Sequence, residues 1–426
     1  MKLFQALPEL IDAGIISEET AQRIRDHYAG DSSKSGSRLI LIFGILGALL
    51  VGLGIILIIG HNWDHLSRLT QTIIAFVPMV VGQAIGIYTL TKRSGDSSWR
   101  EGSATFLALA IGATMAMISQ IYQAQGQLDG FLFVWILLVL PIPYLFRSSF
   151  ACFLYFIGIL YFVGTTTSHS ASFEGWLYWP LFLGGLPYYI KMFLRDKGSN
   201  ALSVMSWILP FTFAIALAFI GQMKEWSIPL IFVNLFACYY LIGNFHAVHS
   251  TTLRSNGFKI IGWLGTAGFL IFLSFDEYWQ KILDIDLVQR LVPNSFEFRY
   301  LIVFFLAALL MLMAQLRRFP WKEIGPMSGL FMVFNLIFFL GIITDFSQLL
   351  TNILILALSI VTIREGAKKD HLGILNSGLL LIGALVIARF FDTDIGFVTK
   401  GLLFVAVGIG FFVANSWIIK KRRNHG

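Results

Sequence analysis

Long, uninterrupted apolar segments alternate with short polar connections along almost the whole chain of 426 residues. About 20 apolar residues in a helix cross the roughly 30 Å of hydrocarbon in a bilayer. The pattern therefore predicts an all-α membrane protein, a polytopic bundle of about 14 transmembrane helices. The expected spans are residues 39–60, 70–90, 103–122, 130–146, 150–166, 176–194, 201–221, 228–248, 258–274, 300–316, 325–343, 346–363, 372–390 and 396–419.

The N-terminal 37 residues contain no such run and predict a cytoplasmic amphipathic helical hairpin with a polar linker. Apolar residues recur on one helical face, Gly14 is expected to end that helix, and Ser17 is placed to cap a second one. The predicted organisation is therefore a hairpin and linker in residues 1–37, a transmembrane domain in 38–419 and a basic cytoplasmic tail in 420–426.

Composition and charge placement support a membrane location. Hydrophobic residues make up 57% of the chain and charged residues 13%, whereas a soluble domain is normally about a quarter charged. The net charge of +7 forms no basic face, so we expect no nucleic-acid partner. If the N-terminus lies inside, most Lys and Arg residues fall in cytoplasmic connections, which predicts that both termini are cytoplasmic. We expect a multi-pass protein of the bacterial inner (cytoplasmic) membrane, in contact with membrane lipids.

Few features of the sequence point to catalysis or metal binding. Cys152 and Cys238 both lie in apolar runs and are expected to be buried thiols. His61 and His65 have a spacing that suits zinc only in a helix, and the Asn-Trp-Asp sequence between them does not favour one. Because no nucleotide-binding loop or nucleophile motif is present in the sequence, we expect no catalytic residue, no metal and no cofactor.

The polar residues inside the expected spans are mostly amides. Each predicts an interhelical hydrogen bond, and together they would suit a pathway for a neutral or zwitterionic solute. They are Gln83, Gln120, Asn234, Asn335, Asn352 and Asn376. The connection 275–299 is amphipathic and is expected to lie along the outer membrane–water boundary, with Trp279 at headgroup depth.

Three span ends on the expected outer side place polar groups at one depth. They contain His61, Asn62 and Asp64 in the first case, Gln120 and Tyr122 in the second, and Arg389 and Asp392 in the third. One interpretation is interfacial anchoring with surface ion pairs. The other is a candidate outward-facing polar site in which Asp64 or Asp392 pairs with Arg389, because isolated charges near hydrocarbon are costly.

Several of these segments resemble a known family. They are residues 10–17 with the helix that follows, the first span ending in His61-Asn62-Trp63-Asp64, the run Gln120-Ile121-Tyr122, and residues 371–392 and 407–411. They resemble the bacterial predicted-membrane-protein family DUF2157, most clearly over the first third and last eighth of the chain. The family has no established activity, so the resemblance implies location and architecture and no reaction.

Three functions are compatible with this architecture. The number of spans and the prolines inside them favour a transporter or flippase for a small or lipid-linked substrate. An enzymatic role is less favoured: it would be a membrane-embedded enzyme acting on lipid-linked sugars at the outer face, with Arg290, Arg299 and Arg389 as phosphate-binding candidates. The third is a non-catalytic sensor or assembly factor whose N-terminal hairpin binds a cytoplasmic partner.

Overall fold

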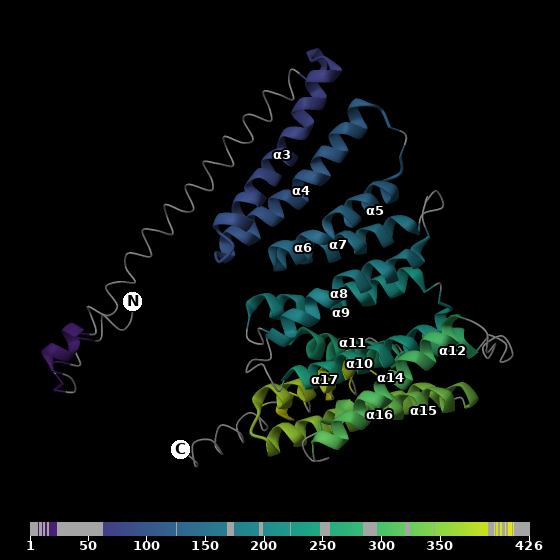
Figure 1. The fold of residues 1–426 in the computed structure, drawn as a ribbon. Coiled ribbons are helices and arrows are strands. Elements are labelled where there is room, and N and C mark those ends of the chain that lie inside the picture. The colour runs from purple at the N-terminus through teal and green to yellow at the C-terminus, as the bar shows by residue number, and fades with distance from the viewer. Residues whose placement is uncertain are drawn as a thin grey trace. The chain divides into compact units, whose positions relative to one another are not determined.

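A computed structural model describes most of the chain, and every secondary-structure element in its described part is a helix (Figure 1). The described residues are 7, 11, 13–14, 17–23, 63–124, 126–167, 174–195, 199–221, 223–247, 256–283, 296–319, 324–344 and 346–390, with single positions between 396 and 412. The expected spans 39–60 and 396–419 and the tail 420–426 lie outside this part, apart from those single positions. By its contacts the chain divides into two units, Met1–Phe76 and Val77–Gly426.

The first unit shows the local turn chemistry expected for the N-terminal hairpin. Gly14 adopts a left-handed backbone with φ of 69°, which glycine tolerates without the steric cost of a side chain, and its N–H donates to the carbonyl of Ile11 at 2.9 Å. Ser17 caps the next turn, because its Oγ accepts the N–H of Thr20 at 3.2 Å. Leu7 and Ala21, two of its apolar residues, are buried.

Nine helical segments in the described part are long and apolar enough to cross a membrane. They are α3 (Arg68–Lys92), α4 (Ser97–Ile121), α5 with α6 (Leu128–Val139 and Pro141–Phe146), α7 (Ser149–Thr166), α9 (Asn200–Ile220), α10 (Ile228–Ala247), α14 (Phe296–Arg318), α16 (Ser347–Lys368) and α17 (Leu372–Phe390). Two shorter apolar helices are α11 (Gly257–Phe272) and α15 (Leu330–Ile343). Helix α8 (Tyr178–Arg195) also matches an expected span but carries Lys191 and Arg195 near its end. Each expected span between residues 70 and 390 therefore coincides with a helix.

Polar residues define where these helices begin. Asp96 accepts the N–H of Ser98 at 2.9 Å at the start of α4, and Asn256 accepts that of Lys259 at 3.1 Å at the start of α11. The start of α7 is bound by a second helix: the Glu101 carboxylate of α4 accepts the N–H of Ser149 at 2.9 Å. A carboxylate at a helix N-terminus satisfies free N–H groups and complements the helix dipole.

Small residues allow the closest pairs of helices in the second unit to approach. A Cβ on Gly262 of α11 would lie 2.6 Å from the carbonyl oxygen of Phe236 on α10. A Cβ on Gly378 of α17 would lie 2.9 Å from the carbonyl oxygen of Ser359 on α16. Such contacts are typical of helix packing in membranes, and they explain why α10 packs closely on α11 and α16 on α17.

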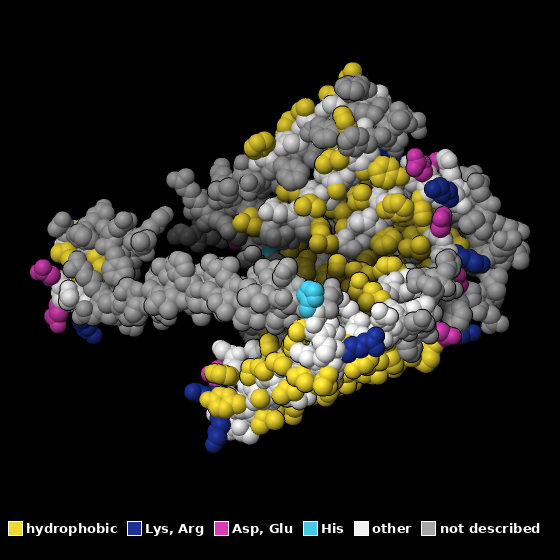
Figure 2. Space-filling model, turned by 90° about the horizontal axis from the view of Figure 1, so that it is seen from above, with side chains coloured by type: hydrophobic (Ala, Val, Ile, Leu, Met, Phe, Trp, Pro, Cys, Tyr) yellow, Lys and Arg dark blue, Asp and Glu magenta, His cyan; other side chains and the backbone are white. Residues whose placement is uncertain are grey.

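The outer surface of the helices is apolar along its length. Leu310 of α14 is 63% exposed and Leu336 of α15 is 62% exposed, and many other large apolar side chains are similarly exposed. Figure 2 shows hydrophobic side chains spread over much of the described surface in view, with few charged side chains among them. Water-soluble monomers rarely expose apolar patches of this extent, so the surface fits contact with lipid.

The 275–299 connection begins with an amphipathic helix, α12 (Asp276–Leu283), and Trp279 on this helix is covered by protein. This side chain is 1% exposed, its Nε1–H donates to the carbonyl of Leu273 at 2.8 Å, and its ring lies 5.1 Å from that of Phe338. Burial against α15, with the indole N–H satisfied, is what a large amphipathic ring requires in a protein core.

Candidate functional site

The second unit contains a pocket of about 590 Å³ at one end of its helices. The pocket lies where the last turns of α10, α14 and α16 meet the first turns of α11 and α17, beside the short 3-10 turn η6 (Pro326–Ser328). Its apolar wall includes the aromatic side chains of Tyr240, Trp263 and Phe319, with Ile324 and Met327.

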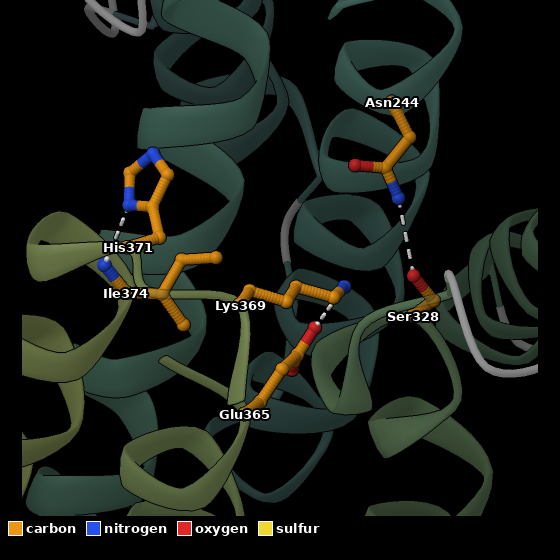
Figure 3. A network of polar contacts seen from close by, with 6 residues as sticks. All are labelled: Asn244, Ser328, Glu365, Lys369, His371 and Ile374. Carbon is orange, nitrogen blue, oxygen red and sulfur yellow. Dashed lines mark hydrogen bonds and ion pairs between the residues drawn. The ribbon is translucent and has the colours of Figure 1, made fainter. Parts of the chain in front are cut away.

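Charged groups lie opposite this wall. Glu365 and Lys369, one turn apart on α16, form an ion pair in which Lys369 Nζ lies 2.6 Å from Glu365 Oε1 (Figure 3). Lys259 comes from the first turn of α11, and its Nζ lies 5.4 Å from the centre of the Tyr240 ring. An ammonium group in this position is attracted by the electron-rich face of the ring, so three charges and an aromatic ring share one cavity.

Amide side chains form another part of the wall. Asn244 of α10 donates through Nδ2 to Ser328 Oγ at 3.1 Å (Figure 3) and, less closely, to Gln315 Oε1 at 3.4 Å. Gln315 of α14 in turn donates through Nε2 to the carbonyl of Leu241 at 2.7 Å. These bonds join α10, α14 and η6 beside the pocket and use most of the N–H donors of the two amides.

The turn between α16 and α17 brings His371 to the pocket. Asp370 adopts a left-handed backbone with φ of 51°, and the N–H of His371 donates to the carbonyl of Gly366 at 2.9 Å. The imidazole then caps α17, because its Nδ1 accepts the N–H of Ile374 at 3.3 Å (Figure 3). Since Nδ1 is the acceptor, a neutral ring carries its proton on Nε2.

Gly325 lies where two of these polar groups approach the chain before η6. A Cβ at this position would lie 3.3 Å from the Tyr240 hydroxyl oxygen and 3.5 Å from Glu365 Oε1. A side chain larger than alanine would therefore occupy space inside the pocket.

A second cavity, of about 360 Å³, is lined by α8, α9, α10, α11 and α14. Its lining side chains include Leu186, Phe213, Ile242 and Met311, and apolar atoms make up its wall. It offers volume for an apolar group but no charged group to orient one, so the polar pocket is the stronger candidate for specific binding.

The residues of the candidate outward-facing site are only partly described. Gln120 is exposed on the last turn of α4, and Tyr122, which is 56% exposed, forms its C-cap. His61, Asn62 and Asp392 lie outside the described residues, as does the side chain of Asp64, whose backbone belongs to the turn η1 (Trp63–His65). The meeting of the three span ends therefore stays a prediction.

Arg389 is the member of that set with a clear role in the second unit. Its guanidinium donates to the backbone carbonyl of Ser274, at the end of α11, and lies 5.3 Å from the centre of the Phe275 ring. Arg389 therefore joins the end of α17 to the end of α11.

The sequence did not indicate the pocket, because Tyr240, Lys259, Glu365 and His371 lie on three helices and one turn that are distant in the chain. In the sequence, Lys259 and Lys369 follow the usual pattern of positive residues at the cytoplasmic ends of spans. The spacing of Glu365 and Lys369, one helical turn apart, is a signal that could have been noticed. Within the described part of the chain, no group of three His, Cys, Asp or Glu residues could hold a metal ion.

Comparison with known proteins gives one match. No curated protein and no solved structure matches the chain. The model of the family described as "Predicted membrane protein (DUF2157)" matches residues 8–152, and the pocket residues from Tyr240 to Ser377 lie beyond that match. Residues 8–152 are therefore similar to the DUF2157 family of predicted membrane proteins, as the resemblance in the sequence predicted.

Proposed function

We propose that this protein is a membrane transporter or flippase for a small or lipid-linked substrate, and that the substrate binds in the pocket between α10, α11, α14, α16 and α17. The observation that supports the proposal is a cavity of about 590 Å³ that combines an aromatic wall with charged groups inside an otherwise apolar bundle. Elsewhere in the unit, Asn234 and Asn335 bond directly to each other between two helices, and neither of them lines this pocket. A large apolar pocket with a few convergent polar groups is the usual form of a ligand site.

The proposal includes a topology of about 14 spans with both termini in the cytoplasm of a bacterial cell. In that topology the pocket opens at the cytoplasmic ends of its helices. The charge pattern supports this orientation, since Arg317 and Arg318 end α14 and Lys368 ends α16, and positive residues favour the cytoplasmic side.

A test that needs no knowledge of the substrate uses access to the pocket from both sides of the membrane. Ser377 lines the pocket, and the two native cysteines are buried, so a Ser377→Cys variant carries one reachable thiol. The probe is sulfonatoethyl methanethiosulfonate, a small reagent that does not cross membranes. A transporter exposes its site alternately to the two sides, so we expect labelling in both right-side-out and inverted vesicles.

Gly95 is the matched control position, because it is exposed in the turn between α3 and α4. A Gly95→Cys thiol should react from one side only. Labelling of Ser377→Cys from one side only would contradict the transport proposal and would be the result expected of a sensor or an enzyme.

A further inference from the structure

Most of the neutral hydrogen-bond donors on the pocket wall are bonded within the protein. The amides of Asn244 and Gln315 bond to each other and to the wall. The hydroxyl groups of Thr362 and Ser377 donate to carbonyls of their own helices, Leu358 at 2.7 Å and Ile374 at 2.7 Å. These neutral groups are therefore largely used within the protein.

Lys259 and His371 offer further donors. Among the described residues, Lys259 Nζ makes no hydrogen bond or ion pair; it lies beside the Tyr240 ring, and the Glu365 carboxylate acts on its charge from a longer distance. A lysine ammonium has three donors and no acceptor. The Nε2 of His371 is a further donor when the ring is neutral, because Nδ1 accepts the Ile374 N–H. An acceptor in the pocket could bond to both of these donors.

The charged groups that line the pocket are also unbalanced, with more positive than negative charge. The pocket is lined by Lys259 and Lys369 but by a single carboxylate, that of Glu365. Glu365 is already paired with Lys369 at 2.6 Å and acts on Lys259 only from beyond ion-pair distance, so one positive charge of the pocket is left without an ion pair among the described residues. A partly buried charge is costly without a counter-ion, and an anion beside Lys259 would lower that cost.

We propose that the pocket binds an organic anion, with its carboxylate or phosphate group beside Lys259 and its flat apolar body between Tyr240 and Trp263. This inference rests on the proposed function in that it names the substrate class of the same pocket. The amides at the span centres suggested a neutral or zwitterionic solute. An anion is proposed instead because the pocket, at the helix ends, is lined by charged side chains. An anionic lipid headgroup and a free anion share this chemistry.

The test measures equilibrium binding of three radiolabelled probes to the purified full-length protein in a neutral detergent. Indole-3-acetate, indole-3-acetamide and tryptamine share one aromatic body and are anionic, neutral and cationic. We expect saturable binding of indole-3-acetate and at least tenfold weaker binding of the other two. Lys259→Gln should weaken binding of the anion at least tenfold, whereas Lys259→Arg and the exposed control Lys92→Gln should retain it.

A second arm identifies the source of the anion. Mixed micelles that contain phosphatidylglycerol are compared with micelles that contain phosphatidylcholine as competitors of indole-3-acetate. Competition by phosphatidylglycerol alone, lost in Lys259→Gln, would support a lipid headgroup as the ligand. Binding of indole-3-acetate that neither lipid displaces would support a free anion.

The outcomes separate this inference from the proposed site. Tight binding of the amide or the amine that is abolished by Gly325→Leu, which fills the pocket, would overturn the anion and leave the site in place. If Gly325→Leu does not affect the binding of a probe, that probe binds elsewhere, and both the anion inference and the proposed site would be overturned. If indole-3-acetate does not bind at all, the anion inference would be overturned.

Discussion

Arg389, near the end of α17, has a backbone carbonyl as a hydrogen-bond partner. The sequence predicted that this guanidinium would need a partner at the end of its span, and a carboxylate was the expected one. In the second unit the guanidinium donates to the carbonyl of Ser274, 115 positions away. A backbone carbonyl at a helix end lacks a helical partner and accepts readily from a cation. No sequence pattern distinguishes that carbonyl from others.

We predict that Arg389→Ala lowers the free energy of unfolding by about 2 kcal/mol, the range for a hydrogen bond to a charged group. The substitution removes the donor to Ser274 and the contact with Phe275. Denaturation by sodium dodecyl sulfate in mixed micelles would measure the change, with the exposed Arg317→Ala as the control. Equal stability of the two variants would show that Arg389 does not hold α17 to α11.

At the scale of helices, the amides inside the spans give a direct test of the sequence-based interpretation. Asn234 of α10 and Asn335 of α15 form a reciprocal pair, with Nδ2-to-Oδ1 distances of 3.1 and 3.0 Å. Each amide also donates to a carbonyl one turn earlier in its own helix, at 2.6 Å. The prediction of an interhelical bond is confirmed for these two residues, although the sequence alone could not pair them.

We predict a coupling of about 1 kcal/mol between Asn234→Ala and Asn335→Ala, in line with hydrogen bonds between transmembrane helices. Either single change leaves a buried amide with fewer partners, so the second change should cost less than the first. A double-mutant cycle on the free energy of unfolding measures the coupling, and Gln83→Ala, at an exposed position of α3, serves as the control. Strictly additive effects would contradict the pairing.

Helix positions were largely predictable from the sequence, and contacts between helices were not. Runs of apolar residues set the length of each helix, because length is what a bilayer requires, and Asp96 and Asn256 mark helix starts by capping. Trp279 shows the limit of this reasoning. An amphipathic segment predicts that an apolar face is covered, but lipid and the core of the same protein cover it equally well.

For the whole molecule, the position of the pocket depends on neighbours that lie far apart in the sequence. Tyr240 and Lys259 lie on adjacent helices, but Glu365 and His371 follow more than 100 residues later. Lys and Arg residues at span ends are expected from the orientation of the protein in the membrane alone. A lysine at such a position therefore gives no separate indication that it also binds a ligand. The outward-facing site predicted from three span ends includes residues outside the described part of the chain, and crosslinking of residues 61 and 391 would test it.

The claim on which the rest depends is that these helices cross a membrane with the pocket at their cytoplasmic ends. Helix α16 tests it most directly, because its 22 residues span about 33 Å at 1.5 Å per residue and its last turn lines the pocket. Phe346, just before α16, and Lys368, at its end, are both exposed. The measurement is labelling of Phe346→Cys and Lys368→Cys in intact cells with a membrane-impermeant maleimide. We predict that Phe346→Cys reacts in intact cells and Lys368→Cys only after permeabilisation; reaction of both in intact cells, or the reverse order, would contradict the account.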